Sequence, residues 1–182
     1  MSNDEQSPVS QGSQVSQQSQ ASQRSQMSRP KADASDAQLL GVRQAVLGAA
    51  AGLAGMASMA PFLALAWVLG AFELSAVAGL SDIVALGPSF LYGTIIFVGG
   101  GMTTLPLLFV SLALFLPGDA VIVKGAVFGA IVWTGFAVAF WTGQAGASLA
   151  LFLVLTLVAH VAYGAVLGTV YARYARIPVY DV

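Results

Sequence analysis

The sequence predicts an all-α fold, a transmembrane four-helix bundle with a disordered N-terminal tail. Two observations carry this prediction. Between residues 44 and 172 the acidic residues, lysines and arginines number only four: Glu73, Asp82, Asp119 and Lys124. They separate uncharged blocks at 44–72, 83–118 and 125–172, and a spanning helix needs about 20 mostly apolar residues. Composition agrees, because 57% of residues are hydrophobic and 8% charged, against roughly 25% charged in a soluble domain. We therefore expect the lipid bilayer to surround this chain.

The N-terminal segment, residues 1–36, alternates Ser and Gln almost regularly and has very few large apolar residues. Such a segment cannot bury enough apolar surface to offset the entropy of ordering, so we expect it to be disordered. The transmembrane domain should then cover residues 37–176, followed by a short C-terminal tail at 177–182.

The first predicted span covers about residues 44–70. Pro61 lies inside it and predicts a kink or a loosened turn, because proline lacks the backbone N–H of a regular helix. Residues 74–87 alternate apolar and polar side chains and are interpreted as a short segment lying at the membrane surface.

The second span is predicted at about residues 88–116. It contains three consecutive glycines at 99–101, which predict local unwinding because each glycine costs a helix roughly 1 kcal/mol relative to alanine. The third and fourth spans are predicted at about 120–142 and 147–171, with a break at the Gly143 to Gly146 turn.

The basic residues predict the orientation. Arginines and lysines precede the first span, lie beside the second loop and follow the fourth span: Arg24, Arg29, Lys31, Arg43, Lys124, Arg173 and Arg176. The first and third loops contain none. By the positive-inside rule, both termini and the second loop face the cytoplasm of a multi-pass protein in the cell membrane.

Three of the four spans carry small residues four positions apart, on one ridge of the helix. The pairs are Gly48 with Gly52, Gly125 with Gly129, and Gly164 with Gly168. Helices in lipid associate by close backbone approach at such ridges, so these pairs predict tight packing. The spacing leaves open whether the ridges join helices of one chain or of a homo-oligomer.

His160 is the single histidine and lies near the centre of the fourth span, on a ridge with Thr156 and the glycines at 164 and 168. An ionisable side chain at this depth is a candidate functional site, either as a haem or metal ligand or as a proton relay. The alternative, which we favour, is a neutral histidine that hydrogen-bonds a group on a neighbouring helix. Haem ligation at His160 would require a second axial ligand, and the candidates are Met56, Met59, Met102 or the histidine of another copy.

Several classes of function are disfavoured. A metal cage of histidines and carboxylates cannot be built with one histidine and no acid in mid-span, so neither a metal nor a cofactor is predicted. The chain contains no cysteine and no nucleotide-binding, zinc-protease or nucleophile-elbow motif, and we expect it not to be an enzyme. The net charge of −1 gives no basis for nucleic-acid binding. The lack of a mid-span carboxylate weighs against proton-driven transport.

The segments 124–133 (KGAVFGAIVW) and 159–168 (AHVAYGAVLG) resemble an uncharacterised family of small four-helix integral membrane proteins of halophilic archaea. The resemblance implies that His160, Tyr163, Gly164 and Gly168 belong to a family motif. Because such proteins are often encoded near haem–copper oxidases, it also implies an accessory role beside a terminal oxidase or another membrane complex. Two functions remain in view: a non-catalytic accessory or assembly subunit, which we favour, and a small transporter or channel.

Overall fold

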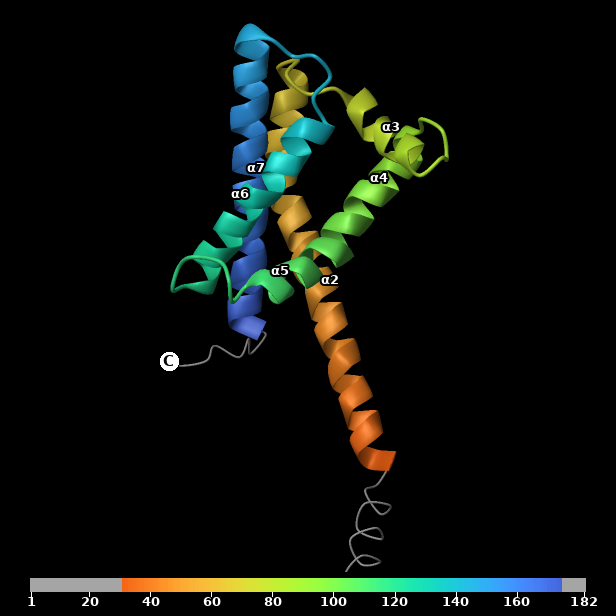
Figure 1. Cartoon of the computed structure of the whole chain (residues 1–182), viewed down its shortest axis with the longest axis vertical. Helices are drawn as coiled ribbons and strands as arrows, with labels where there is room; N and C mark the ends of the chain where they lie inside the picture. Colours follow the sequence, from red (N-terminus) through yellow and green to blue (C-terminus); the bar gives the residue numbers. More distant parts are fainter. Residues whose placement is uncertain (1–30, 175–182) are drawn as a thin grey trace, which may run out of the picture. The chain divides into compact units, whose positions relative to one another are not determined.

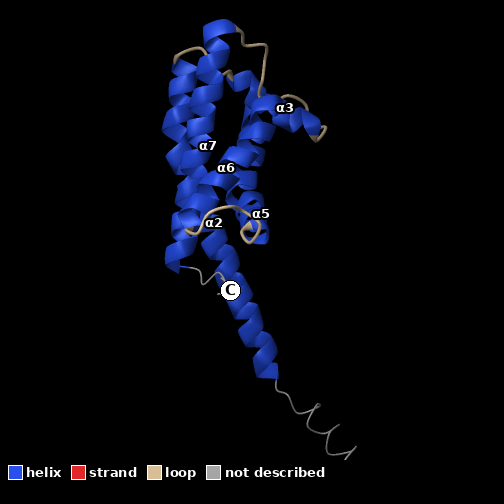
Figure 2. Cartoon of the chain, turned by 60° about the vertical axis from the view of Figure 1, so that its left-hand side comes forward, coloured by secondary structure: helices blue, strands red, loops and turns tan. Residues whose placement is uncertain are grey.

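The computed structural model describes residues 31–174, and the chain divides into two compact units, residues 1–42 and 43–182. Every regular element in the described part is a helix, as Figures 1 and 2 show. Four segments are long and apolar enough to cross a membrane: Gly41–Val68, Phe90–Leu112, Val121–Ala139 and Gly146–Tyr174. The predicted all-helical fold with four spans is therefore confirmed, and it indicates a multi-pass membrane protein.

Helix α2 (Lys31–Val68) contains the first span. It begins inside the segment assigned to the tail, so residues 31–36 are helical, and the rest of that segment lies outside the described residues. The C-terminal tail at 177–182 also lies outside them. The helix is continuous through Pro61, where the sequence predicted a kink or loosened turn. It ends where Gly70 adopts a positive φ of 68°, a conformation that glycine takes readily just after a helix.

Helices α3 (Leu74–Ile83) and α4 (Phe90–Gly99) pack against each other. They touch at Gly93, where a Cβ atom would overlap the carbonyl oxygen of Val77. Buried Ser81 holds the connection: its hydroxyl donates to the carbonyl of Gly87 at 2.6 Å and accepts the N–H of Ser89 at 2.8 Å. The segment interpreted as lying at the membrane surface is thus a short helix fixed to the start of the second span.

The second span is one helix with a π-helical turn in its middle, because α4 is followed directly by η1 (Gly100–Thr104) and α5 (Leu105–Leu112). The N–H of Leu105 donates to the carbonyl of Gly100, five residues back. The glycine triplet therefore produces a wide turn in a continuous helix. Local unwinding, as the sequence predicted it, is limited to this change of hydrogen-bond register.

Helices α6 (Val121–Ala139) and α7 (Gly146–Tyr174) form the most extensive helix pair. Their connection includes the predicted glycine turn, in which Gly143 and Gly146 both have positive φ. The Gln144 side chain donates from this loop to the carbonyl of Ala71 at 3.3 Å, which joins it to the loop after α2. Aromatic rings fill much of the interior in two clusters: Phe109, Phe128, Tyr163 and Tyr171 in one, and Phe72, Phe136, Phe140 and Phe152 in the other.

Candidate functional site

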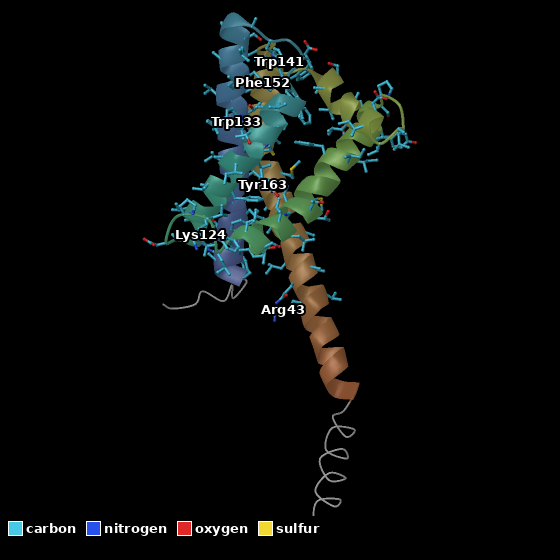
Figure 3. All side chains as sticks on the ribbon, in the orientation of Figure 1. Arg43, Lys124, Trp133, Trp141, Phe152 and Tyr163 are labelled. Atoms are coloured by element: carbon cyan, nitrogen blue, oxygen red, sulfur yellow. The ribbon has the colours of Figure 1, made fainter. Side chains whose placement is uncertain are left out.

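Three polar side chains of α7 are buried in the middle of the helices. The exposed fractions of Thr156, His160 and Tyr163 are 0%, 4% and 1%. Thr156 donates its hydroxyl to the carbonyl of Phe152 at 2.6 Å and accepts the indole N–H of Trp133 at 3.0 Å. Trp133 belongs to α6, so this second bond joins the two helices. Trp133, Phe152 and Tyr163 are labelled in Figure 3.

The His160 ring is held by its own helix. Its Nδ1 atom lies 2.7 Å from the carbonyl oxygen of Thr156, and its ring packs on that of Phe136 with centroids 4.5 Å apart and a tilt of 55°. The sequence favoured a hydrogen bond from His160 to a neighbouring helix. Among the described residues the ring makes no such bond, and Thr156 and Tyr163 make the interhelical bonds.

A carbonyl oxygen can only accept a hydrogen bond, so Nδ1 of His160 carries the proton. In the neutral ring the other nitrogen, Nε2, then has a free lone pair. No hydrogen bond from a described residue occupies Nε2. The helix thereby fixes the tautomer and leaves a free acceptor on a ring that lines a cavity, which is also the form of imidazole that binds a metal ion.

Tyr163 joins α7 to the π-helical turn. Its hydroxyl donates to the carbonyl of Gly101 at 2.6 Å. In the hydrogen-bond pattern of a π-helical turn, the Gly101 carbonyl would accept from the N–H of the residue five positions later. That residue is Pro106, which has no N–H to donate. A carbonyl without a partner is costly in an apolar interior, and Tyr163 supplies the donor that the proline cannot.

The glycine pairs predicted to pack helices lie at contacts within the chain. A Cβ atom on Gly125 would overlap the Gly164 carbonyl, one on Gly129 the His160 carbonyl, and one on Gly168 would meet Val121 of α6. The ridges of α6 and α7 therefore face each other. The sequence had left open whether these ridges join helices of one chain or of several, and here they join helices of one chain.

The ridge of α2 faces the second span and α7. A Cβ atom on Gly48 would lie 2.9 Å from the Tyr171 hydroxyl, and one on Gly52 would lie 2.7 Å from Cα of Met102. Sequence reasoning missed Gly55, where a Cβ atom would meet the Tyr163 ring at 2.6 Å. Its position seven residues after Gly48, on the same face of a helix, could have identified it.

A cavity of about 410 Å³ lies beside His160. Its walls are mostly apolar side chains and glycines from α2, α3, the second span and α6, and its polar side chains are Thr104 of the second span and His160 and Tyr163 of α7. Two of the proposed haem ligands, Met56 and Met59, line it together with His160, whereas Met102 does not. No lysine or arginine lines it, so the carboxylates of a haem would find no basic partner there.

The described part of the chain contains no group of three His, Cys, Asp or Glu side chains that could hold a metal ion. The acidic side chains between the spans, Glu73, Asp82 and Asp119, are exposed. The cavity is therefore a neutral, mostly apolar site, and its polar side chains are His160, Thr104 and Tyr163.

Comparison with known proteins places this site within a family. No curated protein and no solved structure matches the chain. A family model matches residues 42–182, which include nearly all of the four spans and the whole cavity. The chain belongs to DUF6789, a family of unknown function.

Proposed function

We propose that this chain is a non-catalytic accessory or assembly subunit that docks onto a larger membrane complex. The observation that carries the proposal is a ridge on the second span that no other described helix covers. A Cβ atom on Gly99 would meet nothing within 4 Å, and Thr103, one turn later, is exposed with its hydroxyl bonded to the Gly99 carbonyl. Leu107 continues the ridge and is 66% exposed.

Small residues let helix backbones approach closely in lipid, where no hydrophobic force draws helices together. The glycine ridges of α2, α6 and α7 are already used inside the chain. No other described helix lies within 4 Å of a Cβ atom placed on Gly99, so the ridge of Gly99 and Thr103 is uncovered at this position. The Thr103 hydroxyl already donates to the Gly99 carbonyl of the same helix. It therefore offers a partner helix a close contact without the burial of an unpaired polar group.

The nature of the complex rests on the resemblance described above, which favours a respiratory assembly such as a terminal oxidase. The basic residues support an orientation in the cell membrane with both termini in the cytoplasm. Figure 3 supports it further, since Arg43 and Lys124 lie toward one end of the helices and Trp141 toward the other.

Purification in a mild detergent, followed by mass spectrometry of the proteins that remain bound, tests the proposal. We expect a stoichiometric membrane partner. A Gly99→Leu variant should lose this partner, because the larger side chain blocks close approach at the ridge. Gly79→Leu is the matched control, since Gly79 on α3 also has open space at its Cβ position. Recovery of the chain alone, or with only further copies of itself, would contradict an accessory role.

A second candidate is a small transporter or channel. One observation favours it: the cavity lies between the π-helical turn and His160, and wide turns of this kind frequently mark functional positions in helices. Flux of a solute into liposomes that contain only the purified chain would support this function over the first.

A further inference from the structure

The cavity beside His160 offers a hydrogen-bond acceptor that no described residue uses. The Nε2 atom of this buried ring bears a lone pair, and no described residue donates a hydrogen bond to it. Two hydroxyls also line the cavity: that of Tyr163 donates to the Gly101 carbonyl, whereas that of Thr104 makes no hydrogen bond to a described residue. A bound molecule with a hydroxyl could donate a hydrogen bond to this lone pair of His160.

The residues that line the cavity indicate what the remainder of the bound molecule should look like. Three phenylalanine rings line it: Phe97 lies 5.7 Å from Phe140 in an edge-on arrangement, and Phe136 stacks on Phe140 at 4.1 Å. Aromatic walls favour offset or edge-on contact with another ring. No charged side chain lines the cavity, so the molecule should be neutral.

The position of the cavity along the helices indicates the source of the molecule. Met59, Phe97 and His160 each lie well inside a span and away from its ends. The site is thus at the depth of the hydrocarbon, and its occupant should dissolve in the bilayer.

We propose that this cavity binds the reduced headgroup of a lipid-soluble quinone, a quinol, whose hydroxyl donates a hydrogen bond to Nε2 of His160. A quinol is a neutral ring with hydroxyl donors, and it partitions into the bilayer. The tautomer of His160 adds selectivity, because an oxidised quinone has only carbonyl acceptors and presents no donor to Nε2. This proposal is independent of docking at the Gly99 ridge, so either one can fail alone.

The test uses the full chain in phospholipid nanodiscs, without oxygen. The probes are a short-chain quinol and the dimethyl ether of the same quinol, which keeps the ring but has no hydroxyl. Binding is measured as the amount of probe retained by purified nanodiscs, with empty nanodiscs as the blank. We expect the quinol to bind about fivefold to tenfold more tightly than its ether, the effect of one neutral hydrogen bond. Equal affinities would overturn the proposal without the use of any variant.

Two variants locate the site. His160→Leu should bring the affinity for the quinol down to that for the ether, and Gly135→Leu should abolish binding of both, because Gly135 lines the cavity and a leucine there would fill it. Gly99→Ala is the matched control and should bind like the native chain, since Gly99 does not line the cavity. Unchanged quinol binding by Gly135→Leu would place the ligand elsewhere. Retention of copper(I) by the native chain, with no retention of quinol, would overturn the proposal in favour of a soft-metal site with Met56 and Met59.

Discussion

The Tyr163 hydroxyl donates a hydrogen bond to the carbonyl oxygen of Gly101 at 2.6 Å. It replaces the backbone N–H that Pro106, five residues after Gly101, does not have. The bond joins the last span to the π-helical turn of the second. Tyr163 also packs against Gly55 of α2. One side chain therefore connects three of the four spans.

Replacement of Tyr163 by phenylalanine should destabilise the bundle by about 1–3 kcal/mol, because it leaves a buried carbonyl without a donor. Reversible unfolding in mixed micelles measures this change. Tyr92→Phe is the control, since Tyr92 is 49% exposed and its hydroxyl makes no hydrogen bond to the described residues. Equal stability of the two variants would show that the Tyr163 bond contributes nothing to the fold.

Gly129→Ala should destabilise the contact of α6 with α7 by about 1–3 kcal/mol, the usual cost of overpacking. The added Cβ atom would overlap the backbone carbonyl of His160, which cannot move without separating the helices. Gly135→Ala lies on the same helix and meets nothing within 4 Å, so it should be neutral or slightly stabilising. The same unfolding assay compares the pair, and a tolerated alanine at 129 would contradict the close packing.

The α2 ridge yields a second comparison of glycines. Gly52→Ala would place its Cβ atom 2.7 Å from Cα of Met102, so we expect a loss of thermal stability. Gly100→Ala should raise thermal stability instead, because Gly100 is helical with φ −61° and its Cβ position is open. If the order of the two variants were reversed, α2 would not approach the π-helical turn at Gly52.

Thr156→Val should affect Trp133 directly. The substitution removes the hydroxyl that accepts the indole N–H at 3.0 Å, and the buried indole would lose its partner. We expect a blue shift of the tryptophan emission and a lower unfolding temperature, whereas Thr156→Ser, which retains the hydroxyl, should resemble the native chain. Identical spectra for the valine variant and the native chain would speak against this bond.

The absence of cysteine from the sequence permits a direct test of orientation. Single cysteines at Asp119, Ser75 and Ala145, all exposed positions, probe the three loops. An impermeant thiol reagent added to intact cells should label the cysteines at 75 and 145 but not the one at 119, which should react only after lysis. Labelling of position 119 in intact cells would reverse the predicted topology.

The sequence by itself determined that the chain is all-helical with four spans, because hydropathy acts on each segment separately. A run of about 20 apolar residues must form a helix to satisfy its backbone in lipid, whatever its neighbours are. The same local reasoning located the glycine ridges and the buried position of His160. It also indicated that the triplet at 99–101 would depart from regular helix.

Only the tertiary structure decided which ridge meets which helix. The bond between Tyr163 and Gly101 joins residues 62 positions apart, and no local pattern specifies such a pairing. The same holds for the contact of Gly52 with the π-helical turn and for the cavity, since each exists only after separate helices pack together. The His160 tautomer also followed from three-dimensional geometry, because the ring could reach either its own helix or the next, and a distance was needed to choose.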